Sequence, residues 1–330
     1  MRRVSVIGGS GFVGTALCSA LKNRNIPFEI IDLKSSKSFP RESKIGNIRN
    51  PDDLRRTITG DVIVNLAAVH RDDVRDRSEY YLTNVDGTRN VCDIAEEKGI
   101  SHIIFTSSVA VYGFSPVGTD ESGEINPFND YGKSKAQGED ELRKWHAASP
   151  DERNLTIVRP TVVFGEGNRG NVFNLLSQVA SGRFVMIGNG RNRKSMAYVG
   201  NVAAFLLHAI EHPASYCVVN YVDDPDFDMN TLVSQVRSNL FEKPGVGPRI
   251  PYPVGLAAGY LADGVARLSG RSLPISSIRV KKFCANTSFS SAKRGFFGFT
   301  PAFSIEEGLN RTLAAEFISP DPNRECFFTE

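Results

Sequence analysis

A glycine-rich turn near the N-terminus constrains the fold more than any other stretch. Residues 4–14 read VSVIGGSGFVG, so a short apolar, β-branched run ends in glycines and a helical pattern of apolar residues follows at once. Gly8, Gly11 and Gly14 fit G-x-x-G-x-x-G, and Gly9 with the last two fits the related G-x-G-x-x-G. Such glycines permit a tight turn, close approach of backbone N–H groups to a pyrophosphate, and close packing of helix on strand. The turn therefore predicts a dinucleotide site at a helix N-terminus, where unpaired N–H groups attract anions.

A carboxylate follows the turn at the position where a dinucleotide site needs one. The apolar run at residues 28–32 ends in Asp32, about 20 residues beyond the glycines. This carboxylate is expected to hold the adenosine ribose hydroxyls and to repel a 2′-phosphate, which favours NAD over NADP. An ordinary glycine turn of an α/β domain is the alternative. The order strand, glycines, helix, strand and acid disfavours that alternative.

Strands alternate with helical patterns as far as residue 160. Apolar runs at 61–68, 102–106 and 155–159 are separated by helical spacing at 78–98 and 131–145. This alternation predicts an α/β fold with a doubly wound parallel (Rossmann) sheet, whose ligands lie at the carboxyl ends of the strands. Residues at those ends are expected to border the cofactor: Phe12 and Val13 after the glycines, and Leu66, Ala67 and Ala68 after the third strand.

The second half of the chain shows a looser pattern. We expect an NAD-binding Rossmann domain in residues 1–165, and in residues 166–330 mainly a smaller C-terminal substrate lobe with segments that return to the sheet. The tail from Pro320 is expected to be a surface extension. The expected helices are 172–179, 202–210, 231–241, 256–268 and 305–317, and the expected strands are 184–187 and 216–222.

Composition excludes several classes of protein. The net charge of +2 gives no case for a nucleic-acid or membrane partner. The 5 cysteines are scattered and never form Cys-x-x-Cys, which favours a reducing compartment and argues against disulfides and a metal site. No apolar window approaches the roughly 18 residues of a transmembrane helix. We therefore expect a cytoplasmic protein, with a homodimer as one expectation for its oligomeric state.

A tyrosine and a lysine four residues apart carry the predicted chemistry. Tyr131 and Lys135 share one face of the helix expected at 131–145. A free phenol has a pKa of about 10, and a neighbouring ammonium favours the phenolate, which can then act as a general acid or base. Ser108 ends the preceding strand and could hydrogen-bond the same substrate oxygen. The alternative is an incidental surface pair, which the upstream dinucleotide motif disfavours.

At this point the chain resembles the extended short-chain dehydrogenase/reductases of the nucleotide-sugar epimerase/dehydratase group. The resemblance covers the first half densely and the second half loosely, through AYVGNV at 197–202. The motifs that carry it are GGSGFVG (8–14), Asp32, NLAA (65–68), NVDGT (84–88), TSSVAVYG (106–113), YGKSK (131–135) and RPTVVFG (159–165).

The resemblance implies roles for individual residues and NAD as the cofactor. Tyr131 would be the acid/base, Lys135 its pKa partner and a ribose ligand, and Ser108 the partner of the reacting oxygen. Asn84 would support the active-site backbone. Two further residues, Asn47 and Ile48, would lie beside the adenine, although the family usually has Asp-Ile there.

Departures from the family pattern narrow the reaction. The family's 4,6-dehydratases carry an Asp-Glu pair after the active-site hydroxyl residue, and the epimerase-reductases that make GDP-fucose need a Cys-His pair. This chain has Val109 and Ala110 there, which cannot transfer protons. Hydride chemistry at a single carbinol remains, and the chain most resembles UDP-glucose 4-epimerase.

The resemblance also implies a nucleotide-sugar substrate, UDP-linked, in the second half. Candidate substrate residues are Asn171, Arg191, Arg193, Lys194 and Arg279, because basic side chains suit a diphosphate. We predict an NAD-dependent 4-epimerase of a UDP-hexose or UDP-N-acetylhexosamine that forms a transient 4-keto sugar, with a place in polysaccharide biosynthesis. A reductase of 4-keto nucleotide sugars and a non-catalytic NAD-binding protein are the alternatives.

Overall fold

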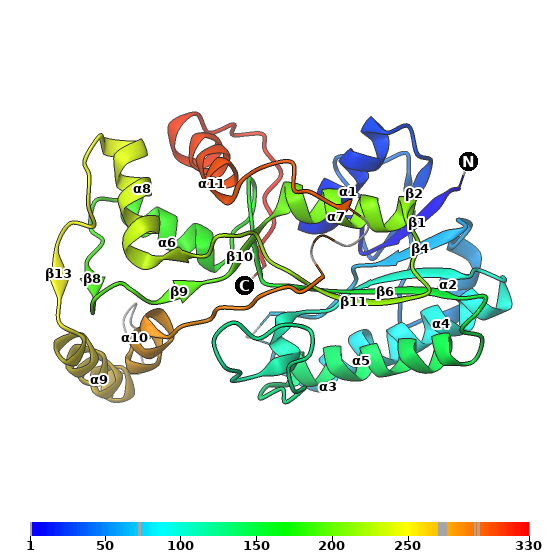
Figure 1. Cartoon of the computed structure of the whole chain (residues 1–330), viewed down its shortest axis with the longest axis horizontal. Helices are drawn as coiled ribbons and strands as arrows, with labels where there is room; N and C mark the ends of the chain where they lie inside the picture. The colour runs from blue at the N-terminus through cyan, green and yellow to red at the C-terminus, as the bar shows by residue number, and fades with distance from the viewer. Residues whose placement is uncertain (1, 72–73, 270–275, 294, 296–297, 330) are drawn as a thin grey trace.

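A seven-stranded parallel sheet organises the first half of the molecule (Figure 1). The computed structural model describes residues 2–329, apart from 72–73, 270–275, 294 and 296–297. The spatial order is β11-β6-β5-β4-β1-β2-β3. Strands are therefore added to one side of β1 as far as β3 and to its other side from β4 onwards. Ligands of open α/β sheets bind at the point where the strand order switches in this way. The strands are β1 (Val4–Ile7), β2 (Phe28–Asp32), β3 (Ser43–Ile45), β4 (Val62–Asn65), β5 (His102–Thr106), β6 (Asn154–Pro160) and β11 (Tyr216–Tyr221).

Helices cover both faces of this sheet, as a doubly wound fold requires. Helices α1 (Phe12–Asn23) and α7 (Val199–Glu211) pack together on one face, while α2 (Pro51–Thr57), α4 (Gly87–Glu97) and α5 (Asp130–Ala147) cover the other. The inner strands β1, β4 and β5 are buried, which explains why their sequences are nearly continuous apolar runs, whereas the edge strand β3 is more exposed. The predicted fold class is therefore confirmed.

The second half forms a smaller lobe beside the carboxyl ends of the strands (Figure 1). Helices α6 (Asn171–Ala180), α8 (Met229–Phe241) and α11 (Ile305–Leu313) share a core with three pairs of short strands. The paired strands are β7 (Val162–Phe164) with β10 (Met196–Tyr198), β9 (Arg193–Lys194) with β12 (Phe227–Asp228), and β8 (Met186–Ile187) with β13 (Arg249–Ile250). Strand β11 lies in the large sheet beside β6, although it follows the first elements of the lobe in sequence. The domain boundary at residue 165 stays a prediction.

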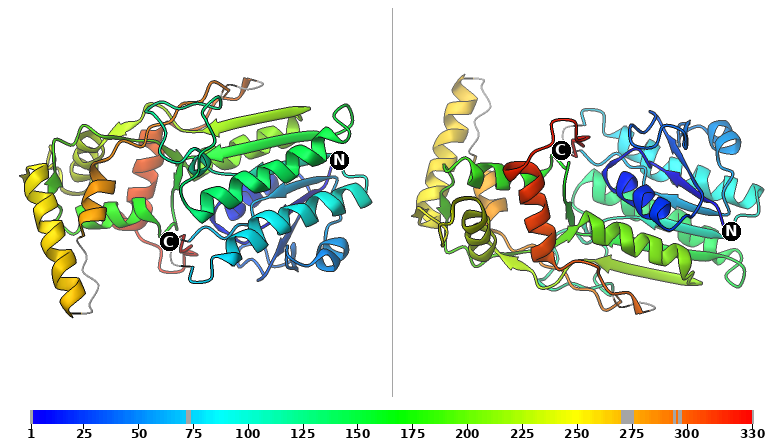
Figure 2. Two further views of the ribbon diagram at one scale, coloured as in Figure 1. Left: turned by 90° about the horizontal axis from the view of Figure 1, so that it is seen from below. Right: turned by 90° about the horizontal axis from the view of Figure 1, so that it is seen from above.

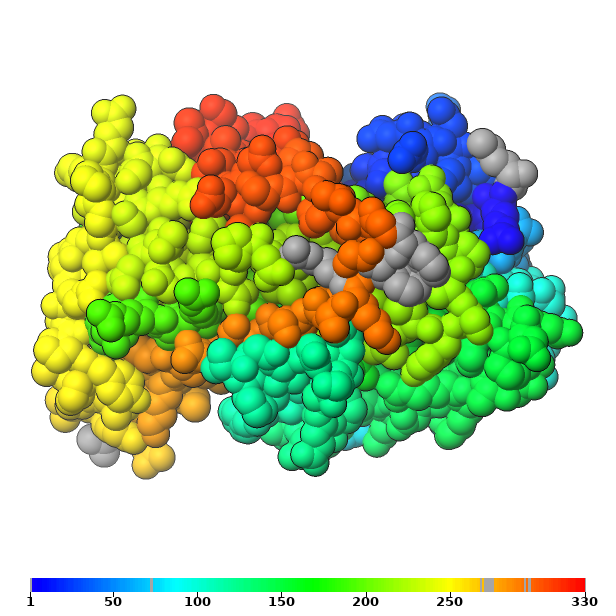
Figure 3. All heavy atoms as spheres, in the orientation of Figure 1, coloured from blue at the N-terminus to red at the C-terminus, as the bar shows by residue number. Residues whose placement is uncertain are grey.

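Helices α9 (Tyr252–Ser269) and α10 (Ser277–Cys284) pack against each other at the far end of this lobe. Both views of Figure 2 show α9 at the opposite end of the molecule from the N-terminus. The segment forms the edge of the molecule in the space-filling view of Figure 3.

The helix predicted for 78–98 is interrupted by a π-helical turn. Helix α3 (Ser78–Tyr81) passes into η1 (Leu82–Asp86) before α4 begins at Gly87. The side chain of Asn84, inside η1, bonds outside the helix to the carbonyl of Val69 at 2.9 Å. Single π turns of this kind are frequent at functional sites.

The C-terminal tail runs over the surface, as predicted, and backbone hydrogen bonds tie it to the lobe. The amide of Phe327 donates to the carbonyl of Gly167 at 2.9 Å, and the carbonyl of Phe327 accepts from Arg169 at 2.8 Å. The chain can approach because Gly167 has no side chain: a Cβ there would lie 2.6 Å from the carbonyl oxygen of Glu325. The ring of Phe327 also lies 5.8 Å from that of Phe12, so the tail joins the lobe to the start of α1.

Candidate active site

The glycine turn joins β1 to α1 and leaves a cradle for a ligand. Gly8 has a φ of +79°, and a Cβ there would lie 2.6 Å from the amide nitrogen of Ala67. A Cβ on Gly14 would lie 2.6 Å from the Cα of Gly9, so helix and turn touch through backbone alone. Gly11 caps α1 without any side-chain hydrogen bond. No side chain of the described residues caps the first N–H groups of α1, so these groups and the positive end of the helix dipole can bind an anion.

Asp32 ends β2 next to this cradle. One carboxylate oxygen accepts from the amide of Ser10 at 3.0 Å, and the other accepts from the amide of Leu33 at 2.7 Å. The carboxylate is thus tied to the glycine turn, at the position where ribose hydroxyls would meet it.

The predicted adenine neighbours lie beyond Asp32, with their polar groups already engaged. The side-chain oxygen of Asn47 accepts from the amide of Arg49, and the carbonyl of Ile48 accepts from Asn90, both at 3.0 Å. The side chain of Ile48 is buried in the core against Gly87. The remaining predicted neighbours, Leu66, Ala67 and Ala68, follow β4 and are partly exposed.

Tyr131 and Ser108 meet at the carboxyl end of β5. Ser108 begins the 3₁₀ turn η2 (Val109–Tyr112), and its hydroxyl accepts from the amide of Ala110 at 3.1 Å. Tyr131 lies in the first turn of α5, whose Gly132 packs on that turn: a Cβ there would lie 2.5 Å from the carbonyl oxygen of Ala110. Burial raises the pKa of Tyr131, and a side-chain hydrogen bond with Ser108 opposes that rise. A nearby cation would be needed to lower the pKa of the phenol towards neutral pH.

Lys135 lies one turn further along α5 and is only 1% exposed. Its ammonium has no hydrogen-bond partner among the residues that the structure describes, and it stands 4.1 Å from the centre of the Phe105 ring. Burial lowers the pKa of Lys135 to about 7, and the charge of Glu139 opposes that fall. A buried donor without a partner is costly, so this group fits a ligand that supplies an acceptor, such as a ribose hydroxyl.

A buried ion pair lies beneath Lys135. Arg159, on β6, donates to both carboxylate oxygens of Glu139, at 2.8 Å and 2.5 Å. It also donates to the hydroxyl of Tyr112 at 2.7 Å. Burial alone would raise the pKa of Glu139, but the bonds and charge of Arg159, with the charge of Arg143, lower it. The carboxylate is therefore charged and fixed four residues from Lys135, where it favours the ammonium.

Asn84 joins three segments around the site. Its amide nitrogen donates to Ser134 on α5 and to the carbonyl of Val69 after β4, both at 2.9 Å. Its oxygen accepts from the amide of Val69 at 2.9 Å. The side chain therefore supports the backbone around Lys135 and the end of β4, as the family resemblance implies for this position.

The candidate substrate residues are brought together only in part. Lys194 is half-buried and donates to the carbonyl of Lys282 at the end of α10, at 2.9 Å. Burial lowers the pKa of Lys194 to about 8, and Cys284 opposes that fall. Arg191 and Arg193 have exposed side chains nearby, and Arg193 and Lys194 form strand β9, paired with β12, rather than part of a loop as predicted. The remaining two lie at helix starts and are exposed: Asn171 opens α6, and Arg279 lies in the first turn of α10.

Sequence reasoning assigned no role to His70 or to the tail. His70 follows the small residues after β4, and the backbone of Ala68 and of Thr329 opposes the lowering of its pKa by burial. The hydroxyl of Thr329 contacts the side chain of Asn168 at 3.2 Å. The tail thus connects the rim of the cofactor cradle to the lobe. No periodicity in the sequence signals that contact.

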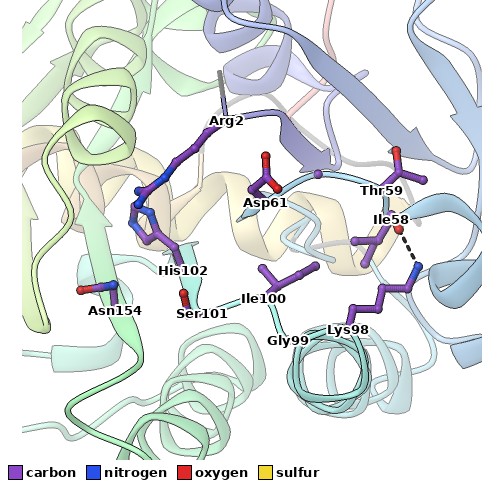
Figure 4. A pocket seen from close by; sticks show the side chains of 11 residues that line it. Arg2, Ile58, Thr59, Asp61, Lys98, Gly99, Ile100, Ser101, His102 and Asn154 are labelled. Carbon is purple, nitrogen blue, oxygen red and sulfur yellow. Dashed lines mark hydrogen bonds between the residues drawn. The ribbon is translucent and has the colours of Figure 1, made fainter.

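The cavity in Figure 4 lies at the wrong edge of the sheet for this chemistry. Its lining includes Arg2, Asp61, His102 and Asn154, which precede or begin strands β1, β4, β5 and β6. These are the amino ends of the strands, whereas the glycine turn, Asp32 and Ser108 follow carboxyl ends. Ligand sites of doubly wound sheets lie at the carboxyl ends.

These observations fit NAD and define the class of protein. The backbone cradle at Gly8–Gly14 suits a pyrophosphate and Asp32 suits a ribose. The ammonium of Lys135, which has no hydrogen-bond partner in the described part of the chain, suits a second ribose. A model of the NAD dependent epimerase/dehydratase family matches residues 4–220. The chain belongs to that family. The predicted family, cofactor and enzyme class, an NAD-dependent epimerase, are therefore confirmed.

Two relatives and one solved structure are similar to this chain over most of its length. It is 47% identical, over 99% of both chains, to N-acetyl-alpha-D-glucosaminyl-diphospho-ditrans,octacis-undecaprenol 4-epimerase of Escherichia coli O157:H7. It is 30% identical to the decarboxylating sterol-4-alpha-carboxylate 3-dehydrogenase of Saccharomyces cerevisiae, over 94% of this chain and 97% of that protein. The UDP-glucose 4-epimerase of Thermotoga maritima with UDP-glucose has the same fold: TM-score 0.72, 20% identity, 94% of this chain and 97% of that one.

Proposed function

We propose that this protein is an NAD-dependent 4-epimerase of an N-acetylhexosamine joined through a diphosphate to a polyprenol. The observation that carries the proposal is the 47% identity, along nearly the whole of both chains, to an enzyme named for that reaction. The yeast relative is also named for an apolar substrate, a sterol carboxylate. The proposal keeps the predicted 4-epimerase chemistry and replaces the predicted UDP carrier by a lipid diphosphate.

Tyr131 is assigned the proton transfer. Its phenolate would accept the proton of the sugar C4 hydroxyl and return it after the sugar has turned over. Ser108, which opposes the rise in the pKa of Tyr131, would hold the same sugar oxygen. Lys135, buried one helical turn away, would favour the phenolate by its charge and bond a ribose of the cofactor.

NAD, when bound, would take the hydrogen of C4 as hydride and give it back to the opposite face of the ring. The chain's own contribution is to hold the cofactor and to keep the proton at Tyr131 while this happens. Val109 and Ala110, the two residues after Ser108, carry no proton-transfer group, which limits the reaction to a single carbinol.

Lys194 is assigned the diphosphate, which carries the same charges in a nucleotide sugar and in a lipid diphosphate. The lysine is fixed by a main-chain carbonyl, so it can keep its position while it binds an anion. Arg191 and Arg193, exposed in the same segment, would add charge nearby.

The test is turnover by the purified protein on two substrates. N-acetylglucosamine diphospho-undecaprenol in detergent and UDP-N-acetylglucosamine in buffer are compared, with Tyr131→Phe as the inactive control. We expect retained NAD and epimerisation of the lipid substrate at least tenfold faster, in kcat/KM, than of the UDP-sugar. Faster turnover of the UDP-sugar would restore the nucleotide-sugar epimerase. NAD binding without turnover of either would favour the binding protein.

A further inference from the structure

Helix α9 has one apolar face that is exposed among the residues that the structure describes. Val254, Leu261 and Val265 are 55%, 73% and 53% exposed. Ala257 and Ala258 lie between them and are exposed as well. The spacings of three, four and seven residues place all five side chains on one side of the helix. A stripe of this kind normally faces a core, whereas here it faces outward.

The opposite side of α9 makes the contacts that hold it to the protein. A Cβ on Gly259 would lie 2.8 Å from the Cα of Ser277, so α9 and α10 touch closely there. The carboxylate of Asp263 accepts from the hydroxyl of Ser277 at 2.5 Å and from its amide at 3.2 Å. Folding of the pair therefore does not need the exposed stripe.

Cations border the stripe. The described part of residues 252–284 contains four basic residues, Arg267, Arg279, Lys281 and Lys282, and a single acidic one, Asp263, which is bonded to Ser277. The ammonium of Lys281 lies 5.3 Å from the centre of the half-exposed Tyr260 ring, and Lys282 beside it is exposed. An apolar helix face with tyrosine and basic residues at its border is typical of helices that lie in the interface of an anionic membrane.

The helix can lie on a bilayer but not cross one. Among the residues that the structure describes, no helix is long and apolar enough to span a membrane. Figures 2 and 3 show α9 at the outer end of the substrate lobe, where a flat surface could reach it. The same pair of helices is tied to residues 191–194, the candidate diphosphate segment, because the carbonyls of Lys282 and Phe283 accept from Lys194 and Asn192.

We propose that the α9 stripe docks on the surface of an anionic lipid bilayer. The stripe inserts among the acyl chains, and Lys281 and Lys282 bind lipid phosphates at its border. The reason for docking rests on the proposed function. A polyprenol tail stays in the bilayer, and a docked lobe would hold the diphosphate segment close to the membrane surface. The proposal departs from the expectation of no membrane partner.

The first test is vesicle flotation of the full-length protein without substrate. Wild-type protein should float with vesicles that contain phosphatidylglycerol and much less with pure phosphatidylcholine. Leu261→Glu should bind roughly tenfold or more weakly, because the insertion of one leucine is lost. The matched control is Val117→Glu, which makes the same kind of change at a 65% exposed position in a loop of the Rossmann half; it should bind as the wild type.

A second pair of variants separates charge from insertion. Lys281→Glu with Lys282→Glu should abolish the preference for phosphatidylglycerol. The control is Arg24→Glu with Lys144→Glu, which changes the charge by the same amount. Arg24 is exposed just after α1 and Lys144 is exposed on α5, so this variant should keep the preference for phosphatidylglycerol. Equal binding by Leu261→Glu and the wild type, or no binding by the wild type, would refute the proposal.

The same test can reveal that the α9 stripe contacts a second copy of the chain instead of a membrane. A wild-type dimer that Leu261→Glu converts to monomer, with no flotation by either protein, would assign the stripe to a subunit interface and overturn the proposal. Turnover keeps the two proposals apart. If the protein floats but epimerises only UDP-sugars, docking stands and the lipid-linked substrate is wrong. If it epimerises the lipid substrate in detergent but never floats, the reverse holds.

Discussion

The nucleotide half and the substrate lobe hold their charged groups in different ways. Beneath Lys135, Glu139 and Arg159 are buried and bonded to each other through two contacts, so their positions are fixed. In the lobe, Arg191 and Arg193 are exposed, and the ammonium of Lys194 is held by a main-chain carbonyl. A rigid half suits hydride and proton transfer, which demand fixed geometry, while a looser lobe can adapt to the carrier of the sugar.

The largest effect should come from the rigid half. Tyr131→Phe removes the proposed proton-transfer group and keeps the ring. Turnover should fall by roughly 10²–10⁴, the usual contribution of general acid–base catalysis, while folding and NAD content stay normal. Steady-state kinetics with a cofactor assay checks this. Near-normal turnover would show that the rigid half does not carry the chemistry.

The second prediction separates activity from stability at Lys135. Lys135→Met should impair both turnover and NAD retention, yet it should stabilise the cofactor-free protein by ~1 kcal/mol, because a buried ammonium without a partner is removed. Denaturant unfolding measures the gain, with Lys144→Met as the exposed control. If Lys135→Met does not increase the free energy of unfolding, the buried ammonium of Lys135 does not lack a partner in the cofactor-free protein.

The pH dependence of that gain gives a further check. The folded-state pKa of Lys135, about 7, lies below the ordinary value of 10.5. The unfolded chain therefore binds more protons between these values, and wild-type stability from this group rises with pH. The advantage of Lys135→Met should be greatest at pH 7 and should shrink towards pH 10. A gain that is constant across this range would exclude titration of Lys135.

A smaller effect is expected in the lobe. Lys194→Met should raise KM about tenfold with kcat nearly unchanged, because a diphosphate contact is equally present in ground and transition states. Arg191→Met, at an exposed position in the same segment, should change KM less. If Lys194→Met lowers kcat instead, the lobe takes part in the chemistry and the contrast between the halves fails.

The smallest effect on turnover should come from Ser108→Ala. A water molecule can partly replace the lost hydrogen bond, so kcat should fall by only a few-fold, less than in Tyr131→Phe. Ser108 opposes the rise in the pKa of Tyr131, and the phenolate is the proposed reactive form. The same variant should therefore move the acid limb of the pH profile of kcat to higher pH. A loss as large as that of Tyr131→Phe would make Ser108 an equal partner.

The sequence predicts what depends on local patterns. The glycines, Asp32 and the four-residue spacing of Tyr131 and Lys135 are visible because turn, strand end and helix face are each set by near neighbours. Contacts made over long sequence separations are not visible. The pairing of Glu139 with Arg159 and the return of the tail to Gly167 are of this kind.

The outward face of α9 shows the same limit. Its apolar spacing correctly predicts a helix, but the pattern alone implies a buried face. Only the packing of the opposite side on Ser277 reveals that the stripe is exposed. A helical pattern therefore identifies the element and leaves its partner undetermined.

The most direct test of the central claim follows one hydrogen atom. The substrate is prepared with deuterium at C4 of the sugar, and the enzyme runs to equilibrium without added cofactor. The account predicts that both epimers keep the deuterium at C4, because the hydrogen that leaves the ring is the one that returns. Loss of the label, or turnover only when reduced cofactor is supplied, would contradict a 4-epimerase and favour the reductase.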